Sequence, residues 1–129
     1  MDPLKRIPLG LVIISVAMLF AAFGTDVFWL AKLVGKPFAQ TLPVDSKVYN
    51  AFVLPDIILS LLLYIGAFGL LRLRRYGFVI SLVAMGMWVS DTLLVLAITK
   101  AGRLDFIIPS LVFAAGTVFY LWVKRELFD

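Results

Sequence analysis

Long apolar segments alternate with short polar ones along this chain. Four segments are each long enough to form a membrane-spanning helix of about 20 residues, and they cover residues 7–25, 50–71, 76–99 and 106–123. Because short connections place consecutive helices antiparallel, the pattern predicts an all-α integral membrane protein. We expect a four-helix antiparallel transmembrane bundle that forms one domain over residues 1–129.

Composition supports a membrane location. Of the 129 residues, 63% are hydrophobic and the mean hydropathy is +1.06, whereas apolar residues make up about half of a soluble domain. The lipid bilayer is therefore the first partner we predict. The first apolar segment follows Lys5 and Arg6 as a signal peptide would, but it is longer than a signal core of about 7–15 residues. We interpret it as a retained first helix.

The predicted outer loop, residues 26–49, contains an amphipathic segment. Apolar residues recur there at helical spacing, with Lys32 and Lys36 between them. Such a segment either lies in the membrane interface or extends the first helix into the headgroup region. Gly35 and Pro37 would then end it.

The start of the second span is open to two interpretations. The helix starts near Ser46 with a kink at Pro55, or it starts at Pro55 with Asp56 in its first turn, where the helix dipole favours an acid. We favour the second interpretation, which makes Asp56 a helix-start residue.

Basic residues predict the orientation. Two basic pairs and one basic turn fall on the same side of the predicted bundle: Lys5, Arg6, Arg72, Arg74, Arg75, Lys124 and Arg125. Positive residues favour the cytoplasmic side, so we expect both termini to be cytoplasmic (N-in/C-in). The arginines of the turn are also possible contacts for lipid headgroups.

The net charge of +4 has the same topogenic explanation, and no basic face combined with aromatic platforms predicts nucleic-acid binding. The chain has no Cys and no His, which excludes disulfides, thiol redox chemistry and Cys or His metal sites. Motifs for phosphate loops and nucleophile elbows are absent as well. We therefore predict no cofactor, no metal site and no catalytic residues, and a protein that is not an enzyme.

Two aspartates form the candidate polar site. Asp56 and Asp91 each lie about fifteen residues from the basic turn, so they reach the same depth when the two middle helices form a hairpin. We expect them in the outer half of the membrane, roughly 10 Å below the outer ends of their helices. Two neighbouring carboxylates in a low dielectric would not both stay ionised, so one is expected to hold a proton. Such a pair can bind a cation or relay a proton.

The neighbours of the aspartates complete the candidate site. Ser60 lies one turn from Asp56, Ser90 and Thr92 flank Asp91 as hydrogen-bond donors, and Tyr64 adds a hydroxyl deeper in the second span. For Asp91, a structural polar contact between helices and an ion, proton or ligand role both remain open.

Two other features of the spans lead to simpler expectations. Asp26 is expected to be a solvated residue at the end of the first span, although it could join a ring of outer-face acids. Gly86 and Ser90 have small-xxx-small spacing, which we expect to serve packing within the chain rather than oligomerisation.

In length and four-span layout the chain resembles the small multidrug exporters. That family carries an acidic residue inside its first span, whereas the first predicted span here has only Ser15. Its function is therefore not carried over. The quinone-linked thiol oxidoreductases share the four-span layout but require cysteine.

The function we expect is that of a small non-enzymatic polytopic membrane protein, either a homo-oligomer or an accessory subunit of a larger membrane complex. The alternative is a small transporter or channel for a proton, a cation or a hydrophobic cation, with Asp91 as the binding acid. A membrane enzyme that acts on lipid with carboxylates alone is the third interpretation.

Overall fold

The computed structural model describes residues 7–33, 51, 53–99 and 104–128, and it is helical over nearly all of them. The helices are α1 (Leu9–Leu33), α3 (Val53–Leu71), α4 (Arg75–Thr99) and α5 (Leu104–Val123), followed by the short 3-10 helix η1 (Arg125–Leu127). Each of the four long helices is long and apolar enough to cross a membrane. The prediction of an all-helical chain with four helices of membrane-spanning length is confirmed for the described residues.

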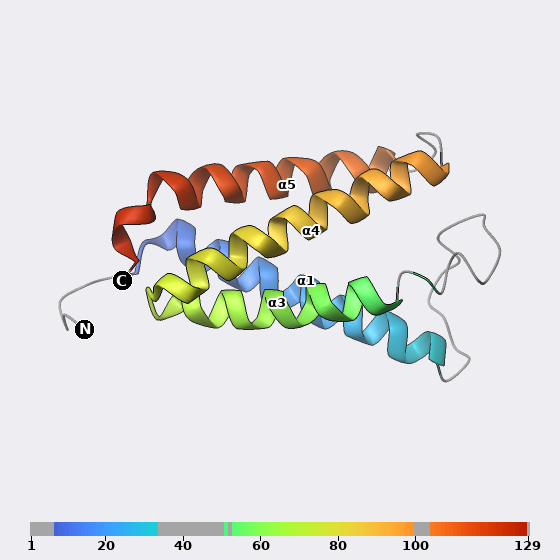
Figure 1. Ribbon diagram of the computed structural model, residues 1–129, viewed down its shortest axis with the longest axis horizontal. Helices are drawn as coiled ribbons and strands as arrows, with labels where there is room; N and C mark the ends of the chain where they lie inside the picture. The colour runs from blue at the N-terminus through green and yellow to red at the C-terminus, as the bar shows by residue number, and fades with distance from the viewer. Residues whose placement is uncertain (1–6, 34–50, 52, 100–103, 129) are drawn as a thin grey trace.

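The long helices alternate in direction and pack in chain order (Figure 1). Helix α1 packs against α3, α3 against α4, and α4 against α5. The start of α1, the connection between α3 and α4, and the end of α5 lie together at one end of the bundle (Figure 1). We call this the hairpin end, and the opposite end the acidic end.

Helix α1 is longer than predicted. It ends at Leu33, not at residue 25, because apolar residues keep their helical spacing and no breaker occurs before Gly35. Thr25 does not interrupt the helix, since its Oγ1 donates to the carbonyl of Ala21 at 2.8 Å. Of the two alternatives for the outer loop, extension of the first helix is the one seen for residues 26–33. The rest of the predicted amphipathic segment, residues 34–49, lies outside the described residues.

The other helix starts also refine the predicted spans. Helix α3 begins at Val53, so Asp56 lies in its first turn, as the favoured interpretation has it. The alternative start near Ser46 lies outside the described residues. Helix α5 begins at Leu104, and Pro109 lies inside it.

The connection between α3 and α4 is a tight helix cap built around Leu73. The amide of Arg74 donates to the carbonyl of Gly69 at 3.0 Å, and the amide of Leu73 donates to that of Leu70 at 3.0 Å. These two bonds form a Schellman motif, whose C′ residue adopts the left-handed conformation and is usually glycine. Here the residue is Leu73, with φ 55°, and its side chain is only 2% exposed. Burial of the leucine side chain offsets the backbone strain.

Two glycines let α3 and α4 meet closely next to this cap. A Cβ on Gly69 would lie 2.5 Å from the Cα of Gly77, and a Cβ on Gly77 would overlap the backbone of Gly69 and Leu70. One turn farther along α3, a Cβ on Gly66 would lie 2.6 Å from Ser81 Oγ. The absence of side chains at these positions fixes the register of the two helices.

Aromatic side chains close the hairpin end. Phe128, which follows η1, is buried and stacks on Phe78 of α4 with ring centroids 5.3 Å apart. Tyr120 of α5 lies against Gly10 of α1, where a Cβ would come within 2.6 Å of the tyrosine hydroxyl. The end of the described chain therefore packs back onto the bundle.

Candidate functional site

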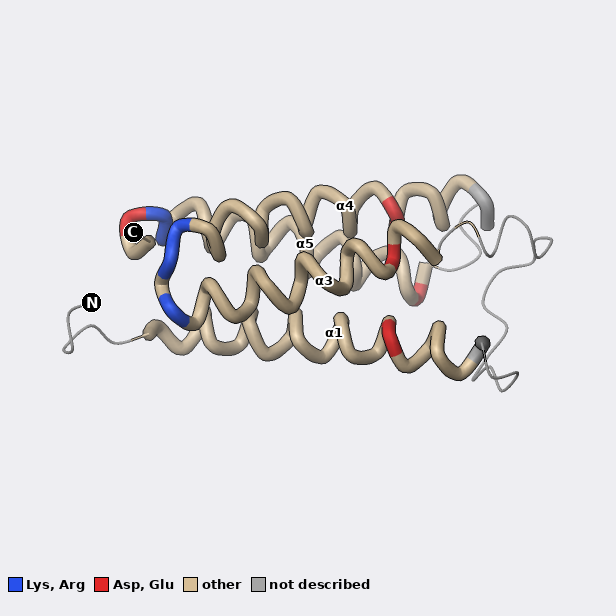
Figure 2. The backbone as a smooth tube through the Cα atoms, turned by 60° about the horizontal axis from the view of Figure 1, so that its bottom comes forward, with Lys and Arg blue, Asp and Glu red and all other residues tan. Residues whose placement is uncertain are grey.

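Acidic residues from four helices lie at the acidic end, three of them on α1, α3 and α4, and the arginines of the α3–α4 connection lie at the hairpin end (Figure 2). Asp26 belongs to α1, Asp56 to the first turn of α3, and Asp91 to α4. All three side chains are partly buried. These three aspartates therefore lie at the opposite end of the bundle from the arginines of the α3–α4 connection.

Asp56 and Asp91 face each other across the α3–α4 contact. Their carboxyl groups are within hydrogen-bonding reach of one another. Asp56 and Asp91 lie about the same number of residues from the tight α3–α4 connection. Because α3 and α4 pack closely side by side, residues at equal distances from that connection lie next to each other. The expected depth of Asp56 below its helix end was too large, however. Asp56 lies one turn from the start of α3, whereas Asp91 lies about 12 Å before the end of the longer α4.

Trp29 of α1 supplies a donor to this pair. Its indole Nε1 donates to Asp56 Oδ2 at 2.8 Å, and its ring packs edge-on against Phe28 with centroids 5.1 Å apart. Because an indole N–H can only donate a hydrogen bond, the Asp56 oxygen that faces α1 is the acceptor. The tryptophan therefore ties α1 to the carboxyl pair.

Asp26 has partners of its own on α3. Ser60 Oγ donates to Asp26 Oδ1 at 2.6 Å, and the hydroxyl of Tyr64 also interacts with this carboxyl group. Ser60 and Tyr64 are four residues apart and therefore share one face of α3. The expectation of a solvated Asp26 was wrong, because α1 continues past it and brings it against this face. Ser60, predicted beside Asp56, bonds to Asp26 instead.

Asp91 is less fully satisfied than the other two aspartates. Its Oδ2 is buried and has no hydrogen-bond partner among the described residues. The two predicted flanking donors do not supply one. Ser90 is exposed on the outer face of α4, and Thr92 Oγ1 donates to the carbonyl of Trp88 at 2.7 Å. A hydroxyl that bonds back to its own helix leaves the carboxyl oxygen unpaired.

This arrangement favours binding of one positive charge. The partners seen for the pair are an indole N–H and a second carboxyl, and a buried carboxyl oxygen without a partner is costly. A proton shared between Asp56 and Asp91, or a small cation between them, would remove both the repulsion and the unpaired oxygen. Over the described residues, no group of three acidic side chains converges as a metal site would require.

Two members of the polar cluster were not predicted as site residues. Trp29 fell in a segment expected either to lie in the membrane interface or to extend the first helix, and Asp26 was expected to be a solvated boundary residue, because the first span was expected to end at residue 25. Continuous helical spacing through Leu33 was the signal that could have placed both residues on α1. Asp26 therefore lies inside the first helix, which the predicted span 7–25 did not include.

The predicted headgroup contacts lie far from this cluster. Arg72, Arg74 and Arg75 are all exposed at the hairpin end, and the guanidinium carbon of Arg72 lies 4.4 Å from the centre of the Phe68 ring. These arginines and the aspartates therefore belong to separate regions of the molecule.

Comparisons of the chain with protein-family models, with curated proteins and with solved structures gave no match.

Proposed function

We propose that the chain is a small, non-enzymatic membrane transporter or channel that binds a proton or a small cation at the Asp56–Asp91 pair. The observation that carries this proposal is the buried Oδ2 of Asp91, which has no partner among the described residues although the Asp91 carboxyl group lies beside that of Asp56. A purely structural contact between helices would be expected to satisfy its buried polar atoms. A site that loads and releases a positive charge would not.

Buried hydroxyls deeper in the bundle support movement through its interior. Ser15 of α1 and Ser81 of α4 are fully buried, and neither Oγ has a partner within the described part of the chain. Along their helices they lie about 15 Å from Asp26 and Asp91, toward the hairpin end. Buried polar atoms of this kind are usually satisfied by internal water, which could extend a polar path from the acids.

The basic residues indicate which side of the membrane the ion would come from. Under the positive-inside rule, the arginines of the hairpin end face the cytoplasm and both termini lie there. The aspartates would then receive their ion from the outer side of the membrane. All three aspartates are partly exposed, which is compatible with access from that side.

The test is ion flux into vesicles that contain the purified protein. An internal pH-sensitive dye reports proton entry when a potassium gradient with valinomycin makes the interior negative. We expect the wild-type protein to acidify the vesicles, and Asp91→Asn and Asp56→Asn to reduce flux to the level of protein-free vesicles. The amide keeps the size of the side chain but holds no exchangeable charge. Flux of other cations is measured in the same vesicles with ion-selective electrodes.

Asp105→Asn provides the matched control. Asp105 is another acid at the acidic end, but it is exposed in the first turn of α5. Its loss should leave flux unchanged. Wild-type flux equal to that of empty vesicles for protons and for cations, or flux that survives both Asp91→Asn and Asp56→Asn, would contradict the transport proposal.

A second candidate function, homo-oligomer or accessory subunit, is favoured by the outer face of α4. Gly86 and Ser90 are exposed there, and a Cβ on Gly86 would meet no atom within 4 Å among the described residues. The expected packing of this seam within the chain was therefore wrong, because α4 turns it away from its neighbours. Small residues on an outer face suit close approach of another helix. Gly86→Leu should then lower the mass of the assembly measured by light scattering in mild detergent, whereas Val83→Leu on the same face should not.

A further inference from the structure

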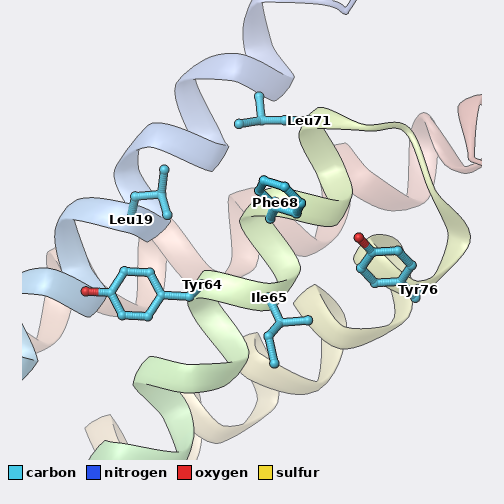
Figure 3. Close-up of a pocket in the computed structure, with 6 residues that line it drawn as sticks. All are labelled: Leu19, Tyr64, Ile65, Phe68, Leu71 and Tyr76. Atoms are coloured by element: carbon cyan, nitrogen blue, oxygen red, sulfur yellow. The ribbon is translucent and has the colours of Figure 1, made fainter.

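The outer surface of α3 carries a hollow near the hairpin end. It has a volume of about 370 Å³ and is lined by Leu19 of α1, by Tyr64, Ile65, Phe68 and Leu71 of α3, and by Tyr76 of α4. Figure 3 shows these side chains around the hollow, with the Tyr64 hydroxyl directed toward α1 and Tyr76 on the opposite side of Phe68. We call this hollow the α3 groove. Apart from two tyrosine hydroxyls, its lining is hydrocarbon.

Both ends of the α3 groove have a defined chemistry. Tyr64 closes the end nearer the aspartates, because its hydroxyl is engaged with Asp26. At the other end the guanidinium of Arg72 lies over the ring of Phe68 at 4.4 Å, and Phe68 itself lines the groove. The groove therefore follows α3 for about 10 Å, from Tyr64 to Leu71, and ends at a positive charge.

We propose that the α3 groove binds one acyl chain of an anionic phospholipid and that Arg72 holds its phosphate. Three of the lining residues are between 42% and 54% exposed, namely Ile65, Phe68 and Tyr76. They lie on a helix pair that spans the membrane, where the surrounding material is lipid. Lipid chains fill a hydrocarbon hollow that water would not enter.

Charge complementarity selects the headgroup. Arg74 and Arg75 are exposed in the same turn as Arg72, and α4 begins at Arg75, so the positive end of its helix dipole adds to the field. A guanidinium binds phosphate through two parallel hydrogen bonds. A headgroup with net negative charge, such as phosphatidylglycerol, should therefore bind more tightly than zwitterionic phosphatidylcholine. The groove shares only Tyr64 with the aspartate cluster, and this inference does not depend on the proposed function.

The test is native mass spectrometry of the purified protein titrated with dioleoylphosphatidylglycerol or with dioleoylphosphatidylcholine. We expect one tightly bound phosphatidylglycerol per chain. Arg72→Gln should weaken its binding about fivefold, the factor that one basic residue contributes at an anionic surface. Arg72→Lys should bind more tightly than Arg72→Gln but less tightly than the wild type, because it keeps the charge and loses the two parallel hydrogen bonds. Equal binding of the two lipids would overturn the proposal.

Arg125→Gln is the matched control for charge. Arg125 is also exposed at the hairpin end, with its guanidinium carbon 4.8 Å from the Trp122 ring, but Trp122 does not line the groove. Its loss should change phosphatidylglycerol binding by less than about twofold. If Arg125→Gln weakens binding as much as Arg72→Gln does, the lipid is held by general surface charge and the proposal fails.

A second pair of variants tests the groove itself. Ile65→Trp fills the hollow and should abolish the tightly bound lipid, whereas Leu61→Trp should retain it. Leu61 is 55% exposed one turn along the same helix and does not line the hollow. Both positions face outward, so both variants should fold, which thermal unfolding in detergent will check.

If Ile65→Trp retains the tightly bound lipid, the lipid binds outside the α3 groove and the proposal fails. Cross-linking of Ile65→Cys between copies would show that a second chain covers the groove instead.

Discussion

The two ends of this bundle are held together in different ways. At the hairpin end, α3 and α4 touch backbone to backbone at Gly69 and Gly77, and the buried Phe78–Phe128 stack closes the base. At the acidic end the helices are joined through polar side chains, with Trp29 bonded to Asp56 and Ser60 bonded to Asp26. One end is a packed contact and the other is a hydrogen-bonded cluster.

This difference suggests that the hairpin end mainly provides stability and that the acidic end mainly provides the binding site. Contacts between glycine backbones are short and have no alternative arrangement, so the hairpin end should keep its geometry when conditions change. Hydrogen bonds between side chains can exchange partners, and a proton or cation can join them. We therefore expect substitutions at the hairpin end to act mainly on folding, and substitutions at the acidic end to act mainly on binding.

The largest effect is expected from Gly77→Ala. Its new Cβ would overlap the backbone of Gly69 and Leu70, which cannot move aside as a side chain could. Overpacking usually costs about 1–3 kcal/mol and sometimes more, so we expect a loss of at least about 3 kcal/mol in the free energy of unfolding. Unfolding in mixed detergent micelles, followed by circular dichroism, measures it.

Gly86→Ala is the control for this substitution. A Cβ at Gly86 meets no described atom within 4 Å, and alanine is about 0.5–1 kcal/mol better than glycine inside a helix. Stability should therefore stay the same or rise slightly. Similar losses in both variants would show that Gly69 and Gly77 do not form a special contact.

Leu73 tests the cap between α3 and α4. Leu73→Ala removes most of a side chain that is only 2% exposed and keeps the unfavourable φ of 55°, so it should cost about 2–4 kcal/mol. Leu73→Gly removes slightly more side chain, but it relieves about 1–2 kcal/mol of left-handed strain. We expect Leu73→Gly to be no less stable than Leu73→Ala in the same unfolding measurement. A clearly less stable Leu73→Gly would indicate that the backbone strain is negligible.

Much of the fold and half of the site could be predicted from the sequence. Apolar periodicity was sufficient for four membrane-length helices, and counting residues from the arginine turn was sufficient to place Asp56 and Asp91 at one depth. Both inferences depend on local spacing, which the sequence contains directly. The rotation of each helix about its axis does not follow from spacing alone.

The parts that could not be predicted depend on contacts between helices. Ser90 is next to Asp91 in sequence, but consecutive helical residues point about 100° apart, and Ser90 faces outward. Ser60 bonds to Asp26, which is 34 residues away in sequence, because α1 packs on that face of α3. Trp29 reaches Asp56 for the same reason. These pairings require the packing of α1, and its length was underestimated.

Ser60→Ala and Ser81→Ala compare a buried hydroxyl that has a hydrogen-bond partner with one that has none among the described residues. Ser60 donates to a carboxyl at 2.6 Å, and side-chain hydrogen bonds between membrane helices contribute about 0.6 kcal/mol on average and at most about 1.7 kcal/mol. Ser60→Ala should therefore lower the free energy of unfolding by about that amount. Ser81 Oγ has no partner among the described residues, so Ser81→Ala should be neutral or slightly stabilising. In the vesicle assay, however, Ser81→Ala should slow flux if its hydroxyl lies on the polar path. Equal loss of stability in both variants would mean that Ser81 has a partner, such as a bound water, that holds the fold together.

Trp29→Phe is expected to have only a small effect on folding. The change removes the bond to Asp56 Oδ2 while keeping an aromatic ring beside Phe28, and side-chain hydrogen bonds between membrane helices contribute only about 0.6 kcal/mol on average. Trp122→Phe, at a ring that is 56% exposed at the hairpin end, is the control and should change neither stability nor flux. Because Trp29 joins α1 to the carboxyl pair, its loss should alter proton or cation flux more clearly than it alters unfolding. If Trp29→Phe unfolds more readily yet transports normally, the tryptophan serves packing alone. The acidic end would then not be the site of transport that we propose.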